Sequence, residues 1–289
     1  MLRILIASWL GILCGGTVVA AAESAPIVTS CAIVDDWVGR VIGPEIRHQT
    51  LVPAGSELHG FQLGPQEAQA LSKASLIVGF SPVSEPWLAD WIQANGKEGR
   101  TLWLQTAEKD GAEPDTHAWT DPSQVGGFIR KIAAEARRTF KDVNSEVIVV
   151  QYLKEVEALD VALRKSFAEV PASRRKLVTQ HPNLGLLARR YGLEVVGTIL
   201  ESPTAEAADP SARHYSALLA LIRREQVRVL VTDEGQNDAI ARRLCQDAGL
   251  PPPVALNFET LAPLGQPGDN WLGMMRLQAG KLREALLRP

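Results

Sequence analysis

The stretch NSEVIVVQYLKEVEALDVALRKSFAE, residues 144–169, decides the fold. Apolar residues recur in it at spacings of three or four, which is the pattern of one face of an α-helix. The apolar positions are Val147, Val150, Leu153, Val156, Leu159, Leu163 and Phe167. A helix of about 26 residues would be about 39 Å long at 1.5 Å per residue, enough to run the length of a protein with two lobes. The sequence therefore predicts one lobe before this helix and one after it.

The rest of the chain alternates short β-rich runs with amphipathic helices. The expected strands are Ile27–Ala32, Arg47–Val52, Leu76–Gly79, Thr101–Leu104, Lys176–Gln180, Glu194–Ile199, Val227–Val231 and Val254–Asn257. The expected helices, besides the long one, are Asp35–Val41, Pro65–Ser72, Pro86–Asn95, Pro122–Lys141, Pro182–Tyr191, Pro210–Glu225, Asn237–Ala248 and Asp269–Leu287. Such alternation is typical of α/β proteins with parallel sheets. We therefore predict an α/β fold with two lobes of parallel sheet flanked by helices, joined by one long rigid helix.

The first segment is expected to be removed rather than to belong to the fold. Arg3 is followed by an almost wholly apolar or small-residue run, residues 4–19, and then by three alanines at 20–22. This order indicates a cleavable secretory signal peptide and hence a periplasmic or otherwise exported protein. A membrane anchor would need about twenty apolar residues and would leave the alanines unexplained. The predicted boundaries are a signal peptide at 1–22, an N-terminal lobe at 23–143, a linking helix at 144–171 and a C-terminal lobe at 172–289.

Composition narrows the class of protein. The chain carries 30 Lys+Arg against 33 Asp+Glu, a net charge of −3, and no block of basic residues, which argues against nucleic acid as a partner. No apolar run after the first segment is long enough to span a bilayer, and nothing suggests a coiled coil, so we expect a monomer. Export would permit a disulfide, but Cys31 and Cys245 lie in apolar contexts and are predicted to be buried free thiols.

Three of the five histidines share a position in the pattern. His59, His117 and His181 each follow a strand-like run or begin a helix, and in open α/β sheets the carboxyl ends of strands line the ligand crevice. Zinc prefers imidazole nitrogen and carboxylate oxygen in a tetrahedral arrangement, so three histidines and one acidic residue would complete a site. His48 and His214 lack this context and are predicted to be surface residues.

Three segments around these histidines carry a resemblance to a known family. They are LVPAGSELHGFQLGPQEAQAL at 51–71, DTHAWTDP at 115–122 and TQHPNLGLLARRYGLEVVG at 179–197. In order and spacing they resemble the ligand segments of the zinc- and manganese-binding solute receptors of bacterial ABC importers, cluster A-I, and of these the zinc-binding branch. The resemblance covers the whole mature chain. It implies two α/β lobes with one metal ion between them, held by His59, His117 and His181, and a histidine at the third position goes with zinc more often than with manganese.

The fourth ligand is left open by the resemblance. The family usually has an aspartate in the last lobe, and two alignments are possible here. One places Glu259 at that position, and the other places Ala262, which has no side-chain oxygen. We rank Glu259 first, then Glu234, then Glu57, then a water molecule.

These observations lead us to expect an exported receptor, not an enzyme, that binds Zn²⁺, with Mn²⁺ less favoured, and delivers it to the membrane permease of an ABC transporter. One alternative is a zinc-dependent hydrolase, because three histidines and a water also describe a catalytic zinc site; a motif such as HExxH that would position a general base is missing. A second alternative is a manganese or iron receptor of the same family. A third is a receptor for a chelated ligand such as haem, against which the three-histidine pattern argues.

Overall fold

Two parallel sheets of four strands each dominate the computed structural model, which describes residues 26–56, 58, 60–105, 116–140, 146–200 and 210–288. The first sheet has the order β2-β1-β3-β4, formed by β1 (Ile27–Cys31), β2 (His48–Val52), β3 (Leu76–Gly79) and β4 (Thr101–Trp103). The second has the order β6-β5-β7-β8, formed by β5 (Lys176–Thr179), β6 (Glu194–Thr198), β7 (Val229–Asp233) and β8 (Val254–Leu256). Every pairing is parallel. The predicted α/β fold is confirmed.

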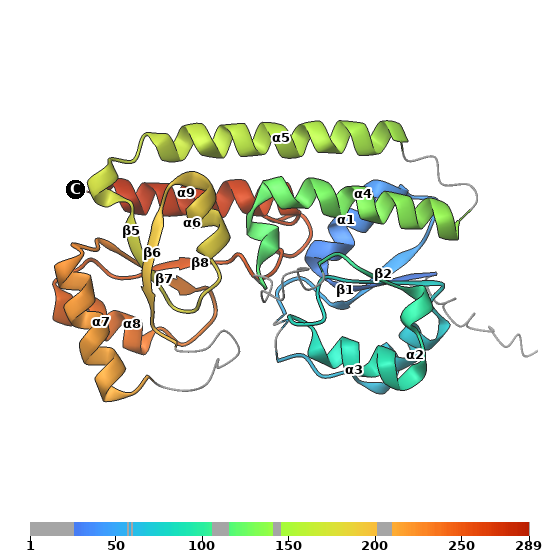
Figure 1. Cartoon of the computed structure of the whole chain (residues 1–289), viewed down its shortest axis with the longest axis horizontal. Coiled ribbons are helices and arrows are strands. Elements are labelled where there is room, and N and C mark those ends of the chain that lie inside the picture. The colour runs from blue at the N-terminus through green and yellow to red at the C-terminus, as the bar shows by residue number, and fades with distance from the viewer. Residues whose placement is uncertain are drawn as a thin grey trace, which may run out of the picture.

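Helices cover both faces of the two sheets (Figure 1). The α-helices of the described residues are α1 (Ala32–Ile42), α2 (Pro65–Lys73), α3 (Pro86–Asn95), α4 (Pro122–Thr139), α5 (Glu146–Ala168), α6 (Gly185–Tyr191), α7 (Ala212–Arg224), α8 (Ala239–Ala248) and α9 (Trp271–Leu287). Three short 3-10 helices lie at Glu98–Arg100, Ala118–Thr120 and Ala172–Arg174. None of the described helices is both long enough and apolar enough to cross a membrane.

The helices form a layer common to both sheets and a separate layer for each. Figure 1 shows α2 and α3 below the first sheet and α7 and α8 below the second, while α1, α4, α6 and α9 lie above the sheets and α5 runs along their outer side. Separate apolar clusters fill the space between the first sheet and α2 and α3, and between the second sheet and α7 and α8. The largest cluster is continuous through the common layer and takes residues from both sheets, for example Val78 of β3 and Val231 of β7.

The long helix is present, but its buried face differs from the predicted one at the start. Val156, Leu159, Leu163 and Phe167 are buried as expected. Before them the structure buries Val149 and Tyr152 and exposes two predicted core positions, Val147 at 80% and Val150 at 49%. Spacings of three or four fit both sets of residues, so the pattern alone does not decide between them. In the structure the Tyr152 ring packs against the Arg40 guanidinium of α1, 5.1 Å from ring centroid to Cζ.

A second helix also joins the regions of the two sheets. α9 follows the last strand of the second sheet, yet its first residue, Trp271, is fully buried against α1, with its ring centroid 5.8 Å from that of Trp37. The Trp271 backbone N–H donates to Asp36 Oδ2 at 3.0 Å, and its indole N–H donates to the Trp119 carbonyl at 3.0 Å. The sequence predicts only α5 in this role. The predicted domain boundaries stay a prediction.

The remaining sequence predictions on single residues have mixed outcomes. Cys31 and Cys245 are free and buried, as predicted, and burial raises the pKa of Cys31 to about 12. The prediction for His48 is wrong in part: its side chain is 26% exposed and its Nδ1 lies 2.8 Å from Asp35 Oδ1. His214 is partly buried, with Nε2 2.9 Å from the Thr198 carbonyl oxygen. The predicted signal peptide, residues 1–22, lies outside the described residues.

Candidate metal site

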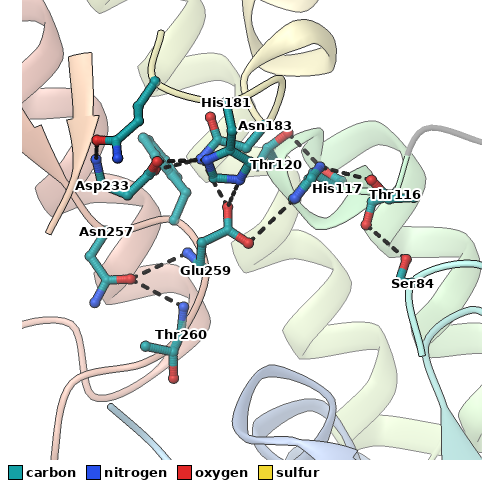
Figure 2. Close-up of polar contacts among 12 residues, drawn as sticks. Ser84, Thr116, His117, Thr120, His181, Asn183, Asp233, Asn257, Glu259 and Thr260 are labelled. Atoms are coloured by element: carbon teal, nitrogen blue, oxygen red, sulfur yellow. Dashed lines mark hydrogen bonds and ion pairs between the residues drawn. The ribbon is translucent and has the colours of Figure 1, made fainter. Parts of the chain in front are cut away.

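Three predicted ligands converge between the two sheets. One possible ligand atom from each of His117, His181 and Glu259 lies within 4.8 Å of the other two. His117 Nε2 is 3.4 Å from Glu259 Oε2, and His181 Nε2 is 3.5 Å from Glu259 Oε1 (Figure 2). The two imidazole rings meet edge to face, with their centroids 5.4 Å apart. All three side chains are shielded from solvent, at 0%, 11% and 13% exposure respectively.

His117 is placed by the turn that precedes α4. The turn continues as the 3-10 helix Ala118–Thr120, in which the Thr120 backbone N–H and side-chain hydroxyl both donate to the His117 carbonyl, at 2.9 Å each. Asp121 then caps α4 by accepting a hydrogen bond from the Ser123 N–H at 2.9 Å, since an aspartate at this position satisfies an otherwise unpaired N–H of the first turn. Thr116 Oγ1 lies 3.0 Å from His117 Nδ1, which leaves Nε2 directed toward Glu259.

His181 follows the central strand β5 and is oriented by Asp233 at the end of the neighbouring strand β7. Its Nδ1 lies 2.6 Å from Asp233 Oδ2. A carboxylate on one imidazole nitrogen fixes the ring orientation and raises the basicity of the other nitrogen as a metal ligand. Burial disfavours the charged imidazolium, but the hydrogen bonds to Asp233 and Glu259 outweigh it and raise the pKa of His181 to about 10. A metal ion would therefore have to replace a proton on this ring.

Glu259 is presented by a turn that its neighbour Asn257 stabilises. Asn257 Oδ1 accepts hydrogen bonds from the backbone N–H groups of Glu259 at 3.2 Å and Thr260 at 3.1 Å. Side-chain bonds of this kind let an asparagine stand in for a backbone turn. The carboxylate is held from the other side by Asn183, whose Nδ2 donates to Glu259 Oε1 at 2.9 Å and to Asp233 Oδ1 at 2.9 Å.

The structure brings together His117, His181 and Glu259 of the predicted ligands. His59 and the alternative ligand Glu57 lie outside the described residues. Glu234, the second-ranked carboxylate, is 55% exposed and 3.9 Å from Lys281 Nζ, outside this cluster. Of the two alignments at the fourth position, the one through Glu259 is the one that brings a carboxylate to the histidines.

Sequence reasoning missed the two residues that support the ligands, Asp233 and Asn183. The helix after His181 is predicted from Pro182, but α6 begins at Gly185. Residues 182–184 form a turn instead, in which the Asn183 backbone N–H donates to the His181 carbonyl at 2.9 Å and the Asn183 side chain turns into the site. A sequence signal existed for Asp233, because it is a carboxylate at the carboxyl end of a buried strand.

The site combines two imidazoles and one carboxylate at a buried junction between two α/β sheets. Its donor atoms suit a divalent metal ion, and its position at the carboxyl ends of parallel strands is where open α/β sheets place ligands. The fold and site thus define an α/β protein with a candidate site for one divalent metal ion between its two sheets.

Comparison with known proteins identifies the family. Residues 27–285 match the model of the ZnuA family, described as zinc-uptake complex component A, periplasmic, and the chain belongs to this family. Its members are substrate-binding proteins of ABC transporters, not enzymes. The alternative prediction of a zinc-dependent hydrolase is therefore wrong.

Individual relatives are distant but cover nearly the whole chain. The manganese ABC transporter substrate-binding lipoprotein PsaA of Streptococcus mitis is 22% identical over 93% of this chain and 91% of its own length. The metal ABC transporter substrate-binding lipoprotein SloC of Streptococcus mutans is 21% identical over 99% of this chain and 98% of its own length.

Solved structures show the same fold. The periplasmic zinc-binding protein TroA of Treponema pallidum superposes with a TM-score of 0.80 at 18% identity, over 92% of this chain and all of that one (100%). The Mn-bound periplasmic metal-binding protein of Candidatus Liberibacter asiaticus superposes with a TM-score of 0.78 at 18% identity, over 90% of this chain and 99% of that one.

Proposed function

We propose that this protein captures Zn²⁺ outside the cytoplasmic membrane and delivers it to the permease of an ABC transporter. The ion is held by His117, His181 and Glu259, together with His59, the remaining histidine ligand expected from the sequence. The receptor is a monomer that leaves the cytoplasm through its signal peptide. Delivery is by docking on the permease, with no covalent chemistry.

The observation that carries this proposal is the convergence of His117, His181 and Glu259, whose possible ligand atoms lie within 4.8 Å of one another. Two donors on a tetrahedral ion with bonds of about 2.0–2.2 Å lie about 3.3–3.6 Å apart. For the same bond lengths, donors at right angles on an octahedral ion lie only about 2.8–3.1 Å apart, and octahedral oxygen-rich sites are typical of manganese. The separation of His181 Nε2 from Glu259 Oε1 is 3.5 Å, and that of His117 Nε2 from the other carboxylate oxygen, Oε2, is 3.4 Å, so each pair falls in the tetrahedral range. Because the two pairs involve different oxygens, a carboxylate bound through one oxygen has to turn to meet both imidazoles.

Manganese is the second candidate, and a specific observation favours it. PsaA of Streptococcus mitis, which aligns along nearly the whole chain, carries manganese in its name. The donor set argues the other way, because imidazole nitrogens suit zinc better than they suit hard manganese. TroA of Treponema pallidum, which has the same fold, is named as a zinc-binding protein.

Thermal unfolding of metal-stripped protein tests the proposal, with Zn²⁺, Mn²⁺ and Fe²⁺ added in turn. An ion present at about 1,000 times its dissociation constant stabilises the folded state by about 4 kcal/mol, which is about 7 °C in melting temperature for a chain of this size. We expect the largest shift with Zn²⁺ at equal free concentrations. The variant His117→Ala should lose that shift.

His214→Ala is the matched control, because it removes a histidine that lies outside the cluster and should keep the full shift. A larger shift with Mn²⁺ than with Zn²⁺ would assign the protein to manganese. If no ion shifts the melting temperature of the unmodified protein, metal capture itself is refuted.

A further inference from the structure

Four side chains at or just after the carboxyl ends of strands of the second sheet form a closed chain of contacts at the site (Figure 2). His181 Nδ1 meets Asp233 Oδ2 at 2.6 Å, and Asp233 Oδ1 accepts from Asn183 Nδ2 at 2.9 Å. The same Asn183 Nδ2 donates to Glu259 Oε1 at 2.9 Å, and that oxygen is 3.5 Å from His181 Nε2. Each member follows or ends one of three adjacent strands, β5, β7 and β8. The spacing between the ligand atoms of His181 and Glu259 is therefore set by the two residues between them.

Asn183 is the central member of this chain. It is 3% exposed, and its backbone N–H donates to the His181 carbonyl at 2.9 Å. An amide nitrogen has two hydrogens, and here it contacts two different carboxylates, those of Asp233 and Glu259. These carboxylates would repel each other across the same gap without a donor between them.

The neutrality of the amide matters as much as its two hydrogens. A lysine or arginine at position 183 could also hold two carboxylates, but its positive charge would oppose the binding of a cation a few ångströms away. An asparagine holds them by hydrogen bonds alone and leaves both negative charges to attract the ion. Its short side chain has few rotatable bonds, so the geometry it imposes on Glu259 is well defined.

We propose that Asn183 is a positioning residue that determines the metal preference of the site. By fixing Glu259 relative to His181 at a tetrahedral spacing, it favours a four-coordinate ion over a six-coordinate one. The inference rests on the proposed function, since it assumes that His181 and Glu259 bind the ion. It adds that a residue with no contact to the ion controls which ion is preferred.

The test compares Asn183→Leu with the unmodified protein and with Asn95→Leu. Leucine keeps the number and branching of the side-chain heavy atoms of asparagine and removes both donors. Asn95 is the control because it is an exposed asparagine at the end of α3, where its amide donates only to the Trp91 carbonyl among the described contacts, at 2.8 Å. Affinities for Zn²⁺ and Mn²⁺ are measured by competition with a chelator, and the visible absorption of the Co²⁺-loaded proteins reports coordination number, since four-coordinate Co²⁺ absorbs much more strongly than six-coordinate Co²⁺.

We expect Asn183→Leu to lower the Zn²⁺ affinity by about 10–100-fold, the usual cost of losing a residue that supports a metal ligand. The Mn²⁺ affinity should fall less, so that the preference for Zn²⁺ narrows, and the Co²⁺ absorption should weaken. Asn95→Leu should change none of these quantities. Urea unfolding of the metal-free proteins shows whether Asn183→Leu is folded; if it is not, Asn183→Ser, which keeps one donor, should give changes in the same direction but smaller.

Two results would overturn the inference while leaving the proposed function intact. One is an equal loss of Zn²⁺ and Mn²⁺ affinity with unchanged Co²⁺ absorption, which would make Asn183 a structural residue only. The other is an unchanged Zn²⁺ affinity. If the unmodified protein binds neither ion, the proposed function fails, and this inference fails with it.

Discussion

Replacing Arg190 with methionine should loosen the junction between the two sheets, because one guanidinium joins three separate segments. Arg190, in α6, contacts Asp160 of α5 through two bonds, Nε to Oδ1 at 2.8 Å and Nη2 to Oδ2 at 2.6 Å. Its Nε is also 3.2 Å from Oδ1 of Asp121, the residue that caps α4. Asp121 follows the His117 turn, and α6 follows the His181 turn. The guanidinium thus ties the two ligand turns to the long helix.

The expected magnitude follows from the partial burial of these groups. The side chains of Arg190, Asp160 and Asp121 are 23%, 15% and 12% exposed. Exposed ion pairs contribute about 0.2–1 kcal/mol, and breaking a fully buried pair costs about 3–5 kcal/mol. A two-bond pair at this depth lies between these limits, so we expect Arg190→Met to lower the free energy of unfolding by about 2 kcal/mol. Methionine keeps the length of the apolar stem, so most of this loss reflects the charge.

Urea denaturation of the metal-free protein measures this effect, and Arg164 provides the control. Arg164 pairs with the same Asp160, at 3.5 Å, but its side chain is 55% exposed, so Arg164→Met should cost less than about 0.5 kcal/mol. Equal losses in the two variants, or a loss below about 0.5 kcal/mol for Arg190→Met, would refute the reasoning.

The same experiment at low pH checks the cause. Burial acts to raise the pKa of Asp160, but hydrogen bonds from Arg190 and Tyr191 outweigh it and lower the pKa. A lowered carboxyl pKa contributes stability above the unfolded value, about 3.9, and that contribution is lost as the pH falls through the folded value. The difference between the unmodified protein and Arg190→Met should therefore be full at pH 6 and shrink below about pH 4.

Three further predictions concern other contacts. The hydrogen bond to Asp35 raises the pKa of His48 against the opposing effect of burial. A raised histidine pKa stabilises the folded protein below the unfolded pKa, about 6.5, and this stabilisation is lost as the pH rises through the folded pKa. His48→Gln should therefore lower the free energy of unfolding more at pH 5.5 than at pH 8.5, as measured by urea denaturation. Asp233→Asn should lower Zn²⁺ affinity by about 10–100-fold, because the carboxylate orients His181; chelator competition measures this, and an unchanged affinity would contradict it. Trp271→Ala should cost about 3–5 kcal/mol of unfolding free energy, because it empties a buried indole site; a loss under about 1 kcal/mol in urea denaturation would show that α9 does not hold the common layer.

The sequence predicts well those features that depend on patterns of neighbouring residues in the chain. Short β-branched runs and helical periodicity place every strand and α-helix of the described residues to within a few residues, because each depends on side chains close together in the chain. His181 is predicted for a related reason: a polar residue directly after a buried strand lies at the edge of a parallel sheet, where ligands bind. His117 is predicted from its place just before a capped helix.

The features that it misses depend on contacts between distant segments. Asn183 and Asp233 meet only because β5 and β7 pair in register, and Glu259 joins them only because β8 is next to β7. Pro182 is a good first residue for a helix, so the sequence favours a helix where the structure has a turn. The choice of Glu259 over Ala262 likewise needs the backbone of the turn, because both residues lie in the same short loop.

The two halves of the site are held together by more than the linking helix. Trp119, two residues after His117, donates its indole N–H to the carbonyl of Phe258, one residue before Glu259, at 2.7 Å. Both side chains are buried, and the apolar core around them is continuous with α5 and α9. A hinge motion that separated His117 from Glu259 would have to break this hydrogen bond and expose aromatic surface, each at a cost of the order of kcal/mol. The site is therefore preformed in the metal-free protein, which limits the ordering cost of binding. Under the proposed function, release of the ion on docking would have to disturb the turns that carry His117 and Glu259, rather than open the two sheets widely.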